Sequence, residues 1–121
     1  IMNEKKLLVV DDEEDLLDLV TYRLSDAGYT IFGTTDSLEA KKRIESEKFF
    51  CIISDLKMPR CTGEELLHTA RNSALNKDTP FFIASGHLDV SGLISNQNQP
   101  TAVMVKPFDY GQLIDALAKI K

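Results

Sequence analysis

The sequence predicts a single α/β domain with one parallel sheet of five strands and helices on both faces of that sheet. Along the 121 residues, five short apolar segments alternate with segments of helical periodicity, which is typical of α/β domains. The segment F-F-C-I-I-S at residues 49–54 is almost entirely apolar, as expected for a strand buried on both faces. The chain is long enough for one hydrophobic core but short for two.

The first strand is predicted at residues 5–10, K-K-L-L-V-V, and a helix follows at residues 14–27. Apolar residues recur along this helix at helical spacing: Leu17, Val20, Leu24 and Ala27. Gly28 is suited to cap its carboxyl end. The second strand is predicted at residues 30–34, T-I-F-G-T.

The middle of the chain repeats this order. Asp36 with Glu39 three residues later resembles a capping box and predicts the start of a second helix. The third strand is predicted at residues 49–54, and Thr62 with Glu65 forms a second capping-box pattern that opens a third helix. The apolar stripes of the two helices are Ala40 and Ile44, and Leu66, Leu67 and Ala70.

The last third supplies two more strands, predicted at residues 81–84 and 102–105. Between them, residues 88–99 make a poor helix because they contain Gly92 and a run of Ser, Asn and Gln, so we expect a short or mobile helix there. Asp109, followed three residues later by a glutamine, caps a final helix. Its apolar residues are Leu113, Ile114, Leu117 and Ile120.

The composition is that of an ordinary soluble domain, with 43% apolar and 27% charged residues. No apolar segment is long enough to span a bilayer and the start has no signal-peptide pattern, so we expect a cytoplasmic protein with no membrane partner. The absence of a basic stripe argues against direct nucleic-acid binding. Cys51 in an apolar segment predicts a buried thiol and Cys61 in a polar loop an exposed one, without a disulfide or zinc site.

One segment accounts for the net charge of −5. Residues 11–15, D-D-E-E-D, hold five of the 19 acidic residues, and the other 14 equal the 14 lysines and arginines. This patch follows the first strand directly. In parallel open sheets, ligands bind beyond the carboxyl ends of the strands, so the residues at those ends are the candidates for a site.

Four of the five predicted strand ends carry at least one polar residue; the residues at these ends are Asp11, Asp12, Ser54, Asp55, Ser85, Gly86, Lys106 and Pro107. Two carboxylates about 4 Å apart repel by roughly 4 kcal/mol at an effective dielectric near 20, so a bound proton or cation is expected among the acids. Oxygen ligands of this kind suit Mg²⁺, which keeps several waters and leaves room for a phosphate oxygen. With Lys106 and Ser85 as anion-binding groups and Asp55 as nucleophile, the set suits phosphoryl transfer onto an aspartate.

These residues resemble the receiver domain of two-component response regulators, of the CheY type. The resemblance rests on Asp11-Asp12, the segment D-L-K-M-P-R-C-T-G at residues 55–63, Ser85-Gly86 and Lys106-Pro107-Phe108. It spans essentially the whole chain, with the motifs in order and at compatible spacings. It implies a flavodoxin-like, doubly wound (βα)5 fold, phosphorylated on one aspartate by a histidine kinase or a histidine phosphotransfer protein.

The resemblance also implies a role for each matching residue. Asp55 matches the phosphoacceptor, Ser85 the switch hydroxyl, and Lys106 the lysine that pairs with the phosphoryl group, with a cis Lys106-Pro107 bond. The metal ligands would be Asp12, Asp55 and the backbone carbonyl of Lys57, with Asp11 acting through water. The ion would be Mg²⁺, with Mn²⁺ as the alternative. The loop-shaping positions are Met58, Pro59 and Gly63.

Several residues keep a second interpretation. Asp12 could serve only as a helix N-cap, and Glu13, Glu14 and Asp15 are better explained as first-turn acids favoured by the helix dipole than as ligands. His68 is expected to face solvent. His87 lies near the phosphoryl site in this family and either tunes dephosphorylation or is simply exposed.

Two positions depart from the family pattern. Val103 stands where an aromatic residue often reports phosphorylation by rotating, and Cys61 stands where methionine is common. The usual output face is therefore altered, and we predict that any coupling uses Ser85 and the loop that follows it.

The sequence thus predicts a signalling switch, not a turnover enzyme, in a single receiver domain over residues 1–121. The downstream effector cannot be named. Because the chain starts Ile1-Met2, either a tag precedes Met2 or the domain was cut from a longer regulator or hybrid kinase.

Three other functions fit the sequence less well. A metal-dependent small-molecule phosphatase or phosphotransferase of the haloacid-dehalogenase type would carry D-x-D after the first strand, whereas Asp11 and Asp12 are adjacent. A flavin-binding module would need a phosphate loop where this chain has five acids. A receiver-like binding module that works without phosphorylation would not need the complete acceptor set.

Overall fold

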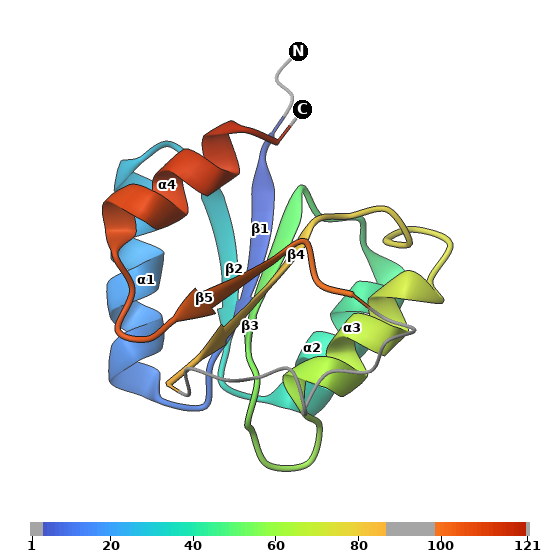
Figure 1. The fold of residues 1–121 in the computed structure, drawn as a ribbon. Coiled ribbons are helices and arrows are strands. Elements are labelled where there is room, and N and C mark those ends of the chain that lie inside the picture. The colour runs from blue at the N-terminus through green and yellow to red at the C-terminus, as the bar shows by residue number, and fades with distance from the viewer. Residues whose placement is uncertain (1–3, 87–98, 121) are drawn as a thin grey trace.

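The structure is a computed structural model that describes residues 4–86 and 99–120. Five parallel strands form one sheet in the order β2-β1-β3-β4-β5 (Figure 1). The strands are β1 (Lys6–Val10), β2 (Thr30–Thr34), β3 (Cys51–Asp55), β4 (Phe81–Ser85) and β5 (Ala102–Val105). The described helices are α1 (Glu14–Asp26), α2 (Ser37–Ser46), α3 (Gly63–Arg71) and α4 (Tyr110–Ala118). The predicted parallel α/β fold is confirmed.

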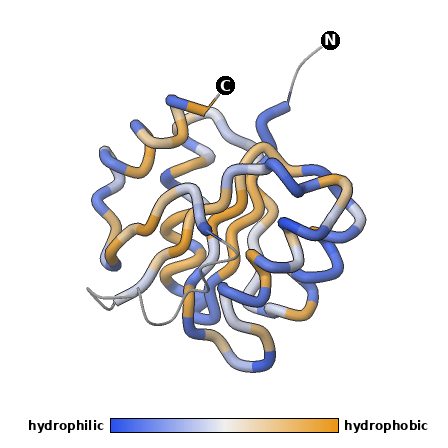
Figure 2. Tube along the Cα trace, turned by 45° about the vertical axis from the view of Figure 1, so that its right-hand side comes forward, coloured by the Kyte–Doolittle hydropathy of each residue, from blue (hydrophilic) through white to orange (hydrophobic). Residues whose placement is uncertain are grey.

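Helices cover both faces of the sheet, α1 and α4 on one side and α2 and α3 on the other (Figure 1). Alternate residues of β1 belong to two separate cores. Leu8 and Val10 pack with α2 and α3, and Leu7 and Val9 pack with α1 and α4. Cys51 to Ser54 are all buried, as predicted for a strand covered on both faces. Hydrophobic residues accordingly concentrate in the central strands (Figure 2).

The helix ends follow the predicted capping residues. Helix α1 ends in a Schellman motif, in which Gly28 N–H donates to the Ser25 carbonyl and Tyr29 N–H to the Leu24 carbonyl. Gly28 has a φ of 103°, which a residue with a Cβ rarely adopts. At the start of α3, Thr62 and Glu65 form the complete capping box.

At α2 the Asp36 side chain accepts from the Leu38 and Glu39 backbone N–H groups. The Glu39 carboxylate instead accepts from the Thr34 hydroxyl at 2.7 Å, so only half of the predicted box forms. The cap still fixes the first turn of α2 against the end of β2.

One prediction about the cysteines was wrong. Cys51 is buried as expected, but Cys61 is also buried, with 3% of its surface exposed. The loop that carries Cys61 turns its side chain into the core between the sheet, α2 and α3, where it joins Leu56 and Met58. Loop composition is a poor guide here because buried and exposed residues are interspersed along this loop. The weak helix predicted at residues 88–99 falls almost entirely outside the described residues.

Among the described residues, no helix combines the length and the apolar character needed to cross a bilayer.

Candidate functional site

The strand register brings the predicted site residues to one edge of the sheet. Val10 pairs with Ser54, so Asp11, the next residue after β1, lies level with Asp55. Asp55 pairs with Ala84 of β4, and Ser85 pairs with Val105 of β5. Lys106 directly follows that last pair. Parallel pairing therefore gathers side chains that are up to 95 residues apart in sequence.

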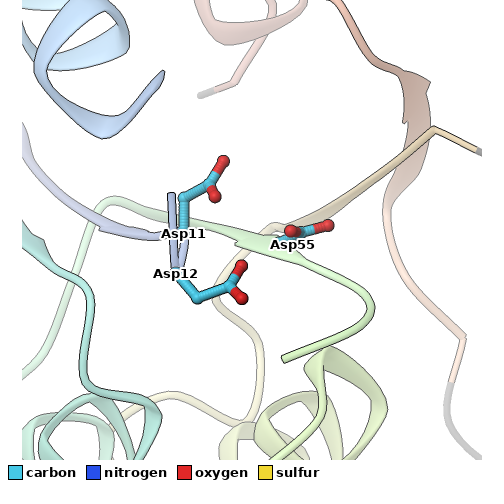
Figure 3. A group of neighbouring side chains, drawn as sticks. All are labelled: Asp11, Asp12 and Asp55. Carbon is cyan, nitrogen blue, oxygen red and sulfur yellow. The ribbon is translucent and has the colours of Figure 1, made fainter. Parts of the chain in front are cut away.

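Three carboxylates meet at this edge. Oxygen atoms of Asp11, Asp12 and Asp55 all lie within 4.8 Å of one another. Asp11 and Asp12 leave the end of β1 and Asp55 leaves the end of β3 (Figure 3). Asp11 is buried, Asp55 is half-buried and Asp12 is exposed, so the cluster runs from the interior to solvent. The predicted convergence of three acids is present in the structure.

Lys106 supplies a cation within this cluster. Its Nζ lies 2.9 Å from Oδ2 of Asp11 and 3.3 Å from Oδ2 of Asp55, and it is 3.8 Å from Oε1 of the exposed Glu13. The lysine side chain is only 11% exposed. Lys106 was expected near the acceptor, but the bridge that its ammonium forms between Asp11 and Asp55 was not predicted. The Lys106-Pro107 bond is cis, as the resemblance implied.

Burial and charge act on the protonation of both partners. Burial raises the pKa of Asp55, and the Asp11 carboxylate adds to this, while Lys106 opposes it. Burial lowers the pKa of Lys106, but the hydrogen bond that it donates to Asp11 and the charges of both aspartates outweigh this effect and leave the pKa above its usual value. Lys106 is therefore held as a cation at neutral pH.

The acidic patch divides by role. The N-cap of α1 is Glu13, whose side chain makes no capping hydrogen bond. Its backbone N–H donates instead to Oδ1 of Asp11 at 2.9 Å. The alternative in which Asp12 only caps the helix is therefore wrong. Glu14 and Asp15 lie in the first turn of α1, where the helix dipole favours them.

The loop after Asp55 is packed closely beneath the strand end. Oδ1 of Asp55 accepts from the Leu56 N–H at 2.9 Å, and the Gly63 N–H closes the loop on the Leu56 carbonyl at 2.8 Å. A Cβ on Gly63 would lie 2.3 Å from the backbone oxygen of Asp55, so this position requires glycine. The first residue of α3 thus sets the position of Asp55.

These groups line a cavity of about 470 Å³. Its lining residues are Asp12, Glu13, Leu16, Asp55, Lys57, Ser85, Gly86, Lys106 and Pro107. Ser85 is buried at the end of β4. Leu16, an apolar wall, was missed by sequence analysis, although helical spacing places it one turn after Asp12 and Glu13. A larger cavity of about 720 Å³ lies at the opposite, amino-terminal ends of β4 and β5 and holds none of the predicted site residues.

The donor set fits a hard divalent cation. Three carboxylates supply oxygen ligands, and Asp12 is open to solvent that could complete the coordination of Mg²⁺. Lys57 lies at the cavity wall, and among residues 4–86 and 99–120 no donor hydrogen-bonds to its carbonyl. No sulfur or imidazole ligand joins the described cluster, and a donor set made of oxygen atoms favours Mg²⁺ over softer metals.

Three further predictions concern residues around the site. His68 is exposed on α3, as expected, and His87 lies outside the described residues. Val103 lies on the edge strand β5 with 46% of its surface exposed.

A five-stranded parallel sheet that carries an acidic cluster and a lysine at its carboxyl edge is the arrangement that the sequence predicted for a receiver-type signalling domain. The sequence matches the family of response regulator receiver domains over residues 7–118, and the chain belongs to that family. Receiver domains act as signalling switches, and the function predicted from the sequence is confirmed at this level.

Individual relatives agree. The chain is 30% identical over 113 residues to the phosphoglycerate transport system transcriptional regulatory protein PgtA of Salmonella typhimurium, covering 93% of this chain and 27% of that protein. Its fold is similar to the chemotaxis response regulator CheY4 of Vibrio cholerae, with a TM-score of 0.88, 29% identity and coverage of 98% and 100%. It is also similar to the response regulator TrrA of Thermotoga maritima in complex with Mg²⁺ and BeF, with a TM-score of 0.86, 26% identity and coverage of 97% and 99%.

The chain spans between a quarter and a half of the length of the curated relatives it matches.

Proposed function

We propose that Asp55 accepts a phosphoryl group from a histidine kinase or a histidine phosphotransfer protein, with Mg²⁺ as cofactor. The observation that carries this proposal is the position of the Asp55 carboxylate, which contacts Lys106 and lies within the three-acid cluster at the cavity. The metal would be held by Asp12, Asp55 and the Lys57 carbonyl, with Asp11 acting through water. Mn²⁺ is expected to substitute, because it accepts the same oxygen ligands.

In the proposed step, a carboxylate oxygen of Asp55 attacks phosphorus, a P–O bond forms, and the P–N bond of the donor phosphohistidine breaks. The electron pair of that bond returns to the imidazole nitrogen. The bound cation offsets charge on the phosphoryl oxygens. Lys106 binds one of those oxygens through its ammonium, and Ser85 donates its hydroxyl to another. Water later hydrolyses the acyl phosphate slowly, which resets the switch.

Incubation with acetyl phosphate and Mg²⁺ tests this assignment. We expect one added phosphoryl group in the intact mass of the wild-type chain and none in Asp55→Asn, because the amide is not a nucleophile for phosphorus. Asp115→Asn is the matched control, since Asp115 is an exposed acid on α4 and lies away from the cluster. An adduct of equal yield on Asp55→Asn, or no adduct on the wild type with any small donor, would show that Asp55 is not the phosphoacceptor.

Metal binding is expected to stabilise the fold through Asp12. When free Mg²⁺ is about ten times its Kd, the free energy of unfolding of the wild type should rise by about 1.4 kcal/mol. Asp12→Ala should lose this increment, because it removes the open carboxylate of the cluster. The measurement is urea unfolding with and without Mg²⁺. Asp15→Ala removes an equal charge from the first turn of α1 and should keep the full increment; equal responses from both variants would contradict the ligand assignment.

We further propose a setting for this phosphoacceptor. The chain forms one receiver domain over residues 1–121, in the cytoplasm, either alone or within a longer regulator or hybrid kinase. Its phosphoryl donor is a histidine kinase or phosphotransfer protein, and its output passes to an effector that the chain does not identify. The regulatory relatives support this assignment.

A further inference from the structure

The loop between β3 and α3 is attached to the start of α2 by two side-chain contacts. The Ser37 hydroxyl donates to the Pro59 carbonyl at 2.8 Å, and Nη2 of Arg60 lies 3.2 Å from Oδ1 of Asp36. We call this set, Asp36, Ser37, Pro59 and Arg60, the α2 latch. It joins two segments that are 22 residues apart in sequence.

The α2 side of the latch belongs to the buried and capped start of that helix. Ser37 is 1% exposed, so its hydroxyl has little access to water as an alternative partner and depends on the Pro59 carbonyl. Asp36 is the N-cap of α2, and its Oδ1 also accepts from the Leu38 N–H at 2.9 Å. The loop is therefore bonded to the first turn of a capped helix whose apolar residues are in the core.

The loop side of the latch holds an uncommon backbone conformation. Arg60 has a φ of 71°, the one positive φ of a residue other than glycine in the described parts of the chain. The Cys61 N–H donates to the Pro59 carbonyl at 2.8 Å across Arg60, as in a γ-turn, a type that is rare and strained at positive φ. Such conformations persist where surrounding contacts hold them. Here Ser37 contacts Pro59 and Asp36 contacts Arg60.

Lys57 lies between this latch and the acceptor. Asp55 is fixed in β3, the Leu56 and Met58 side chains are buried, and Pro59 is tied to Ser37. The Lys57 peptide is therefore held at both ends while its side chain stays exposed. Because Lys57 lines the cavity, we infer that a loop free to move at Pro59 would also shift the Lys57 peptide.

We propose that Asp36, Ser37 and Arg60 are positioning residues for the metal site, which they serve by fixing the Lys57 carbonyl. None of them touches the three-acid cluster, so they act through the loop. The inference rests on the proposed metal site. It adds that the affinity of this site for Mg²⁺ depends on contacts made by α2, an element that supplies no ligand.

The test compares Mg²⁺ affinity with stability in the full chain. Ser37→Ala should weaken Mg²⁺ binding about five- to tenfold by calorimetric titration, in proportion to one hydrogen bond of about 1 kcal/mol. Ser46→Ala is the matched control, because Ser46 lies at the other end of α2 and its hydroxyl donates to the Lys42 carbonyl of its own helix. In acetyl phosphate assays, the Mg²⁺ concentration for half-maximal rate should rise while the rate at saturating Mg²⁺ is kept. A purely structural role would not move that concentration.

A second pair of variants covers the case in which Ser37→Ala does not fold. Asp36→Asn keeps the helix cap, since asparagine caps as well as aspartate, and removes only the charge that pairs with Arg60. Arg60→Gln removes the other charge of this exposed pair. Each substitution should weaken Mg²⁺ binding about two- to threefold. The double variant should bind Mg²⁺ no more weakly than either single variant, because both substitutions remove the same ion pair.

The outcomes separate this inference from the proposed function. Wild-type affinity in Asp36→Asn and Arg60→Gln, together with wild-type affinity in any folded Ser37→Ala, would overturn the latch. A wild-type chain that binds no Mg²⁺ would overturn the proposed metal site itself. Weaker Mg²⁺ binding in the latch variants, together with wild-type affinity in Ser46→Ala, supports both the latch and the proposed metal site.

Discussion

Lys106→Met should slow phosphorylation of Asp55 by acetyl phosphate about 10²- to 10³-fold, the cost typical of removing one preorganised group that stabilises charge in a transition state. The Lys106 ammonium lies 3.3 Å from the Asp55 carboxylate, where an incoming phosphoryl group would bring further negative charge. Methionine keeps the length of the side chain and removes its charge. The rate of adduct formation, followed by intact mass at saturating Mg²⁺, measures the effect.

The same substitution should change the titration of Asp55. In the metal-free wild type, burial raises the pKa of Asp55 and Lys106 opposes that rise, so Lys106→Met should raise the pKa further. The carboxyl resonance of Asp55 in NMR spectra of metal-free protein would report this shift.

Lys119→Met, at the exposed C-cap of α4, is the matched control and should react at the wild-type rate. A rate for Lys106→Met within a factor of about three of the wild-type rate would mean that Lys106 only neutralises the charge of the acids and does not stabilise the transition state.

Asn76→Asp should lower the free energy of unfolding by about 3–5 kcal/mol near neutral pH, although it changes the side-chain volume very little. Asn76 is fully buried. Its Nδ2 donates to the carbonyls of Ile44 and Glu47, and its Oδ1 accepts from the Phe49 N–H and the Thr79 hydroxyl. One amide thus joins the end of α2, the approach to β3 and the loop before β4. A carboxylate would present oxygen to two buried carbonyls.

The expected defect depends on pH in a defined direction. Burial and the two carbonyls disfavour the charged form, so the folded-state pKa of the introduced carboxyl group lies above its unfolded value. Stability is therefore lost as pH rises from the unfolded pKa through the folded pKa, and it is partly regained in acid. Urea unfolding across pH measures this.

Asn72→Asp is the control, because Asn72 is exposed at the end of α3. We expect it to change stability by less than about 1 kcal/mol. Equal losses at the two positions would show that the buried hydrogen bonds of Asn76 are not the cause.

Much of the site could be predicted from the sequence because parallel sheets bind ligands at one edge. Asp11, Asp12, Asp55, Ser85 and Lys106 each follow or end an apolar strand, and strand ends are visible as the points where apolar runs stop. The capping box at α3 was also predictable, since its residues are local in sequence and make local bonds.

The parts that failed depend on contacts between distant segments. Cys61 was expected at the surface because its neighbours are polar, yet the loop folds its side chain into the core. The bridging position of Lys106 and the bond from Ser37 to Pro59 join residues that are 95 and 22 apart, and no local pattern encodes either contact.

The amino-acid sequence by itself determined the order of strands and helices, the two-sided burial of the sheet and the identity of the residues at its carboxyl edge. These features follow from apolar periodicity and from caps, which act over a few residues. Only the tertiary structure decided how Asp11 and Asp55 share Lys106, which residues of the β3–α3 loop are buried, and how α2 holds that loop. Those contacts arise because register and packing bring side chains together across the sheet, and their distances and burial exist only once the chain is folded.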